Sequence, residues 1–156
     1  MTAQKKYVPA MPSNVPLYDR DFYAWAHEQA ALLRAGRLND LDIENVAEEI
    51  ESMGRSEKRE LVSRLTVLQV HVLKWKLQQA LRSTSWQHTI QEQRRRTIRH
   101  LGENPSLKPL LSDIVAIAFE DAASDAKAET GLERRVFPQT CPWTADALLQ
   151  DGWLPE

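Results

Sequence analysis

Apolar residues recur every three or four positions along most of the chain, which is the spacing of one face of an α-helix. This pattern, with its Pro and Gly punctuation, predicts helices over residues 19–36, 42–53, 56–79, 85–103, 105–131 and 144–150. No stretch alternates apolar and polar residues convincingly, as a half-buried strand would. The sequence therefore predicts an all-α fold, a single compact bundle of five or six helices with an irregular C-terminal strap.

The third predicted helix is expected to form the centre of the bundle. One apolar stripe along it consists of Leu61, Leu65, Leu68, Val72 and Trp75. A second stripe, on the opposite side, consists of Val62, Val70, Leu73 and Leu77. A helix that is apolar on two sides is normally enclosed by its neighbours. Large apolar residues of the strap are expected to anchor it to this core, namely Phe137, Trp143, Trp153 and Leu154.

The first two predicted helices each have one apolar face. In the first helix this face consists of Phe22, Trp25, Leu32 and Leu33. In the second helix it consists of Ile43, Val46, Ala47, Ile50 and Met53. Gly54 is expected to break or bend the path between the second and third helices, because glycine is a poor helix former.

Length and composition are those of an ordinary globular protein. The 156 residues suit one domain, and we expect it to cover residues 17–156 after a flexible, proline-containing tail over residues 1–16. The single Cys excludes an internal disulfide framework and any Cys-based zinc or iron–sulfur site. No secretory signal and no membrane-length apolar run is recognisable, so we expect a cytoplasmic location and no membrane partner.

The formal net charge of −2 conceals a division of the chain into three parts. Residues 1–54 carry a net charge of −4, residues 55–108 carry +8 and residues 109–156 carry −6. Basic helices packed between acidic ones would explain this division. The alternative is an exposed basic face that receives an anion.

Several ordered blocks of sequence carry a family resemblance. They are LYDRDFYAWAHEQAALLRAG at 17–36, EEIESMGRSEK at 48–58, HVLKWKLQ at 71–78, SWQHTIQEQRR at 85–95, PSLKP at 105–109, ETGL at 129–132 and FPQTCPWT at 137–144. With these blocks the chain resembles the bacterial family known as domain of unknown function 29. The resemblance implies a compact all-helical domain and no established activity.

A polar cluster on the third predicted helix is the first candidate site. At 100° per residue, Arg64, His71 and Lys74 lie along one edge of an apolar stripe, and Arg94 of the next helix is expected to point partly inward. Buried charges need partners, and the candidates include Glu48, Glu120 and Asp121. A structural network is the favoured interpretation. An acid–base site or a small anion pocket around His71 is the alternative.

A second candidate is the arginine run of the fourth predicted helix. Arg95, Arg96 and Arg99, in a run with Arg94 and His100, could bind phosphate groups, because a guanidinium donates two parallel hydrogen bonds to them. No recognisable nucleic-acid-binding motif accompanies these arginines. A solvated face or a partner surface is the favoured interpretation.

The sequence offers little for metal or covalent chemistry. His88 and Glu92 have the spacing of a helical metal pair, but they lie on an arginine-rich face and are expected to be solvated. Cys141 is expected to be a partly buried, inert thiol in the strap. We therefore predict no metal and no cofactor, and no catalytic residue can be named.

Three functions are compatible with these residues. The favoured one is a protein–protein interaction module that acts as a homo-oligomer, because aromatic and arginine residues dominate interface energetics. The alternative is binding of nucleic acid or a phosphate ligand through the basic segment 55–108. The third is an enzyme with an acid–base site centred on His71, and an enzyme is the less favoured class.

Overall fold

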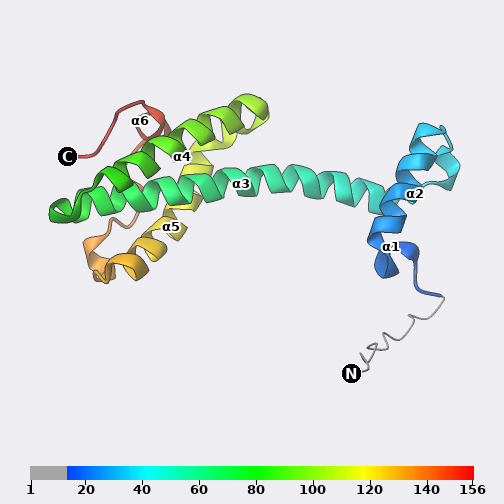
Figure 1. Ribbon diagram of the computed structural model, residues 1–156, viewed down its shortest axis with the longest axis horizontal. Helices are drawn as coiled ribbons and strands as arrows, with labels where there is room; N and C mark the ends of the chain where they lie inside the picture. The colour runs from blue at the N-terminus through cyan, green and yellow to red at the C-terminus, as the bar shows by residue number, and fades with distance from the viewer. Residues whose placement is uncertain (1–13) are drawn as a thin grey trace, which may run out of the picture. The chain divides into compact units, whose positions relative to one another are not determined.

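The structure is a computed structural model that describes residues 14–156, and Figure 1 shows its helices. The predicted tail over residues 1–16 therefore lies almost entirely outside the described residues. Within residues 14–156 the α-helices are α1 (Leu17–Arg20), α2 (Phe22–Arg34), α3 (Ile43–Leu77), α4 (Thr84–Glu103), α5 (Leu111–Thr130) and α6 (Ala145–Leu149). Short 3₁₀ helices η1 to η4 span Leu38–Asp40, Gln79–Leu81, Pro105–Leu110 and Arg134–Val136. The prediction of an all-α fold is confirmed.

The chain divides into two compact units, and the division falls inside helix α3. The first unit ends at Met53, and the second runs from Gly54 to Glu156. The first unit contains α1, α2 and the first turns of α3. The second contains the rest of α3 and all later elements.

Helix α3 corrects one sequence-based prediction. It continues without interruption through Gly54, where a break or bend was expected. Gly54 is exposed, and an added Cβ would meet nothing within 4 Å, so no tertiary contact requires a glycine there. A single glycine in a helix interior costs only about 1 kcal/mol relative to alanine, and that cost is too small to end a long helix by itself.

The core of the second unit is built around the buried face of α3. Figure 1 shows α4 and α5 on either side of this helix. One cluster joins α3 to α4, α5 and α6 through Leu61, Leu65, Leu68, Val72, Ile90, Leu101, Ile114, Val115, Ala118 and Leu148. A second cluster consists of Val70, Leu73, Phe119, Ala122, Ala123, Ala126 and Phe137. The two predicted apolar stripes of this helix thus both supply core residues.

The C-terminal strap packs on this core as expected. Phe137 is buried in the second cluster, and the partly buried Trp143, Trp153 and Leu154 pack against the first. The rings of Trp143 and Trp153 meet edge to face, with their centroids 6.0 Å apart. The irregular strap therefore belongs to the folded unit.

The observed ends of α4 and α5 differ from the predicted ends by a few residues. Helix α4 begins at Thr84, one residue before the predicted start, and Ser83 caps it, because the Ser83 hydroxyl accepts a hydrogen bond from the Trp86 N–H at 3.2 Å. Residues from Pro105 form a 3₁₀ helix before α5 begins at Leu111, so the predicted fifth helix is two elements. Gly131 ends α5 as predicted, with φ of 71°, a conformation that favours glycine.

Candidate functional site

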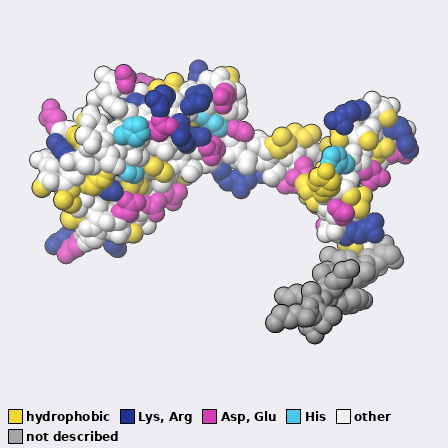
Figure 2. Space-filling model, in the orientation of Figure 1, with side chains coloured by type: hydrophobic (Ala, Val, Ile, Leu, Met, Phe, Trp, Pro, Cys, Tyr) yellow, Lys and Arg dark blue, Asp and Glu magenta, His cyan; other side chains and the backbone are white. Residues whose placement is uncertain are grey.

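An apolar groove lies on the first unit between α2 and the start of α3. It has a volume of about 410 Å³. Its apolar lining residues are Phe22, Trp25, Ala26, Ala30, Leu33, Val46, Ile50 and Met53. Three of them are strongly exposed, since Phe22 retains 50%, Ile50 63% and Met53 69% of its surface. Figure 2 shows hydrophobic side chains, in yellow, gathered over this unit.

Polar contacts at the beginning of α3 hold the two walls of the groove together. The Asp42 carboxylate accepts hydrogen bonds from Trp25 Nε1 at 3.0 Å and from Asn45 Nδ2 at 2.8 Å. The Asp42 backbone N–H donates to Gln29 Oε1 at 2.8 Å. The hydrogen bond from Asn45, together with that from Trp25, lowers the pKa of the Asp42 carboxyl below its usual value of 3.8. Asp42 is therefore the junction between the two helices.

A second polar contact joins the beginning of the unit to α3. The Tyr18 hydroxyl donates a hydrogen bond of 2.5 Å to Glu49 Oε1. This bond to a carboxylate is the main reason why the pKa of Tyr18 rises to about 12. The Tyr18 ring also packs edge to face on Trp25, with centroids 4.8 Å apart. Trp25 in the groove is thus held in place, while Phe22, Ile50 and Met53 remain exposed.

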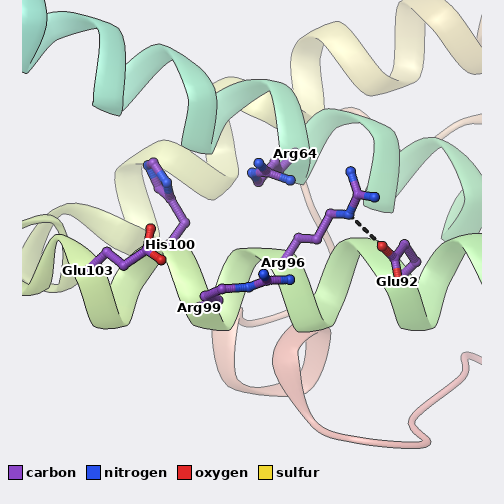
Figure 3. Close-up of a pocket in the computed structure, with 6 residues that line it drawn as sticks. All are labelled: Arg64, Glu92, Arg96, Arg99, His100 and Glu103. Carbon is purple, nitrogen blue, oxygen red and sulfur yellow. Dashed lines mark hydrogen bonds and ion pairs between the residues drawn. The ribbon is translucent and has the colours of Figure 1, made fainter.

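A polar hollow in the second unit is the other candidate site. It lies between α3 and α4 and has a volume of about 300 Å³. The lining residues are Arg64 of α3 with Glu92, Arg96, Arg99, His100 and Glu103 of α4. In Figure 3, Arg64 reaches from one helix, and Arg96 and His100 reach from the other, into the space between them.

Arg64 is held on one side and left without a partner on the other. One of its terminal nitrogens lies 2.6 Å from Glu60 Oε1, in an ion pair within α3. Its Nε is buried and has no hydrogen-bond partner among the described residues. A buried donor without an acceptor typically costs about 1–3 kcal/mol. Arg64, a lining residue of the hollow, therefore has an unused donor that is buried.

The arginine run of α4 is partly neutralised within its own helix. Glu92 accepts hydrogen bonds from both Arg95 and Arg96. The bond from Arg96 Nε to Glu92 Oε1 measures 2.5 Å. In residues 14–156 no hydrogen bond or ion pair involves the Arg99 guanidinium. The predicted group of Arg95, Arg96 and Arg99 is therefore divided, because Arg96 and Arg99 line the hollow and Arg95 does not.

His100 forms one end of the hollow and fixes α4 to α3. Its Nε2 lies 2.9 Å from the Glu57 carbonyl oxygen and 3.5 Å from the Glu57 carboxylate. A carbonyl only accepts, so Nε2 carries the hydrogen. Only 7% of the His100 side chain is exposed. This histidine positions the wall of the hollow.

The structure does not bring the predicted polar cluster together. His71 Nδ1 lies 2.9 Å from the Val67 carbonyl of its own helix, and His71 lines none of the hollows described above. The Lys74 ammonium pairs with Glu129 at 2.8 Å and lies 4.8 Å from the centre of the Trp86 ring. Arg64 pairs with Glu60 of its own helix. Each group has a separate environment.

Arg94 points inward, as expected, but its partners are not carboxylates. It is 2% exposed, its Nε donates to the Leu148 carbonyl and its Nη2 to the Trp153 carbonyl, both at 2.8 Å. Burial lowers the pKa of the Arg94 guanidinium, an effect that the nearby Asp151 opposes. Arg94 thus ties the strap to α4, a structural role.

The three predicted acidic partners lie elsewhere. Glu48 belongs to the first unit, and Glu120 is exposed on α5. Asp121 lines a different hollow between α3 and α5, of about 410 Å³, together with Thr66.

The described residues offer nothing for metal chemistry and little for a reactive thiol. Within residues 14–156, no group of three His, Cys, Asp or Glu side chains could hold a metal ion. Glu92 contacts arginines rather than His88. The Cys141 thiol donates a hydrogen bond to Gln69 Oε1 at 3.2 Å, and burial raises the pKa of this thiol.

No helix in the described part of the chain is long and apolar enough to cross a membrane.

Sequence reasoning placed His100 beside the arginine run but missed Glu103 as a member of the site. Glu103 follows Arg99 by four residues, so the rotation of the helix could have grouped it with Arg96, Arg99 and His100. It also did not foresee that Ile50 and Met53 would be so exposed, because the hydrophobic pattern does not say whether an apolar face has a partner within the chain.

The fold and the two candidate sites define a small all-helical protein with one exposed apolar groove and one arginine-lined hollow. The family model described as Domain of unknown function DUF29 matches residues 17–154, and the chain belongs to this family. The match confirms the resemblance carried by the sequence blocks. No curated protein and no solved structure matches the chain significantly.

Proposed function

We propose that the protein is a protein–protein interaction module that acts as a homodimer, in which a second copy covers the apolar groove of the first unit. The observation that carries this proposal is the exposure of Phe22, Ile50 and Met53 at 50%, 63% and 69% along one groove. Contiguous exposed apolar surface of this kind is typical of interaction sites. The single free cysteine fits a cytoplasmic location for the dimer.

The energetics favour coverage of this groove. Complete burial of one large apolar side chain contributes about 1.5–3 kcal/mol. Besides α2 and the first turns of α3, the first unit contains only the four-residue helix α1 and a short 3₁₀ turn among its described residues. These elements are too short to bury the remaining apolar surface of the two longer helices. A partner that supplies an element long enough to do so therefore gains free energy from several side chains at once.

A second copy is the occupant that the helix pattern favours. On α3, Ile43, Val46, Ile50 and Met53 follow the alternating three- and four-residue spacing of helix-pairing seams. Two copies related by a two-fold axis would place such a seam in each other's groove. Both copies then form a four-helix arrangement from two helices each.

Light scattering behind size exclusion tests the proposal. The full chain at low and high salt should have a mass of about 36 kDa, twice the monomer mass of 17.9 kDa. Ile50→Glu should give the monomer mass at both salts, because a charge in the groove is not tolerated between apolar surfaces. Ile50 is exposed, so the variant should retain its helical circular dichroism spectrum.

The matched control is Ile117→Glu. Ile117 is 47% exposed on α5 of the second unit, outside the groove, and the substitution makes the same change of charge and size. This variant should remain dimeric. A wild-type monomer at high concentration, or an Ile50→Glu variant that stays dimeric, overturns the proposal.

A further inference from the structure

We propose that the hollow between α3 and α4 binds the phosphate group of a small phosphorylated ligand through Arg64, Arg96 and Arg99. This site belongs to the second unit and shares no residue with the groove of the first. The proposal therefore does not rest on the dimer. Its first basis is convergence, because guanidinium groups from two helices line one hollow of about 300 Å³ (Figure 3).

The second basis is an unused hydrogen-bond donor. Arg64 Nε is buried and has no acceptor in the part of the chain that the structure describes. Glu60, at 2.6 Å, occupies only a terminal nitrogen of the same guanidinium. A rotation of the Arg64 guanidinium towards an oxyanion in the hollow would give this donor an acceptor, and a guanidinium is well suited to two parallel bonds with phosphate oxygens.

The third basis is the distribution of carboxylates around the arginines. One carboxylate, that of Glu92, is shared by Arg95 and Arg96, while Arg99 has no ion-pair partner among residues 14–156. Glu103 also lines the hollow, and in Figure 3 it lies towards His100, at the end away from Glu92. In and around the hollow there are four carboxylates and four guanidiniums, those of Glu57, Glu60, Glu92 and Glu103 and those of Arg64, Arg95, Arg96 and Arg99. The charges therefore balance, and the hollow selects an anion by directed donors rather than by net charge.

The chemistry and size of the hollow favour a phosphate with a small attached group. A phosphate monoester presents three terminal oxygens, which match donors that arrive from α3 on one side and α4 on the other. A carboxylate has only two oxygens and cannot satisfy three guanidiniums equally. The volume of about 300 Å³ exceeds what a bare phosphate needs and leaves room for a compact organic group.

The test is a titration of the full chain at constant ionic strength, followed by NMR at the arginine Nε–Hε signals. The probes are inorganic phosphate, a small phosphate monoester, acetate and chloride. We expect saturable shifts of the Arg64 and Arg96 signals with phosphate and the monoester. Acetate and chloride should give no saturable shift. Equal responses to all four anions overturn the proposal.

Two variants and one control locate the site. Arg99→Gln should weaken phosphate binding about tenfold, which corresponds to about 1.4 kcal/mol. Arg99 is exposed, so this variant should fold normally. Arg64→Lys keeps the charge but removes the buried Nε donor, and calorimetry should show weaker binding with it as well. Arg135→Gln removes an equal charge from a residue with 82% side-chain exposure outside the hollow and should bind like the wild type.

Two further outcomes separate the alternatives. A single-stranded oligonucleotide that binds when inorganic phosphate and the monoester do not would overturn the small-ligand proposal and favour a nucleic-acid surface. The Ile50→Glu variant of the first unit should bind phosphate normally. That result distinguishes failure of the phosphate site from failure of the proposed dimer.

Discussion

The two units of the chain use their apolar residues in opposite ways. In the second unit every large apolar residue of α3 that follows Gly54 is buried or partly buried, and Leu61, Leu65 and Leu68 are all 0% exposed. In the first unit the only buried hydrophobic residue in the described range is Trp25. Helix α3 thus has an exposed apolar face in the first unit and a buried apolar face in the second. The difference indicates that the second unit has a closed apolar core, whereas the first leaves large apolar side chains exposed.

The largest expected effect comes from a cavity in the core of the second unit. Phe119→Ala should lower the free energy of unfolding by about 3–5 kcal/mol, because Phe119 is 1% exposed and its ring meets that of Trp143 edge to face. Chemical denaturation measures this change. Phe22→Ala, at 50% exposure in the first unit, should cost less than about 1 kcal/mol in the dilute monomer. Similar losses for both variants would contradict the contrast between the units.

The next effect concerns the attachment of the strap to the second unit. Arg94→Met should lower the free energy of unfolding by about 2 kcal/mol, because the Leu148 and Trp153 carbonyls lose their donors. Removal of the buried charge recovers part of that loss. Chemical denaturation gives the change in stability. Tryptophan fluorescence should also report greater exposure of the strap.

Arg95→Met is the control for this variant. Arg95 is the next residue on the same helix, but its side chain is 68% exposed and it pairs only with Glu92. Its loss should change stability by less than about 0.5 kcal/mol, as exposed ion pairs contribute little. An equal loss at both positions would contradict the role given to Arg94.

The sequence was a good guide to the second unit and a poorer one to the sites. The periodicity correctly predicts two buried stripes on α3, because each stripe has a partner within the chain, as the burial of Leu65 and Leu73 shows. The same periodicity on Ile50 and Met53 says nothing about whether a partner exists. Tertiary context also decided the polar groups, because Arg94 meets carbonyls of the strap at a sequence separation that no local pattern reveals.

A smaller effect, confined to the first unit, follows from the lowered pKa of Asp42. A carboxyl whose pKa is lower in the folded protein stabilises the fold above its unfolded pKa, and that contribution disappears as the pH falls through the folded value. Acidification below the usual carboxyl value of 3.8 should therefore weaken the hydrogen bonds from Asn45 and Trp25. The indole N–H signal of Trp25 in NMR measures this loss.

Asp42→Asn is the matched variant for that titration. The amide oxygen still accepts one hydrogen bond, but it does not titrate in this range. The acid-dependent shift of the Trp25 indole signal should therefore disappear in the variant. An unchanged shift would mean that another carboxyl governs the contact.

The smallest expected effect concerns the continuity of α3 at the boundary between the units. Gly54→Ala should raise the free energy of unfolding by about 0.5–1 kcal/mol, because Gly54 lies in the helix interior and a Cβ meets nothing within 4 Å. Gly131→Ala should instead be destabilising, since φ is 71° there. Denaturant midpoints measure both changes. No gain at Gly54 would mean that the chain is not helical at that residue in solution, and the contrast between the two units would then coincide with a break in α3.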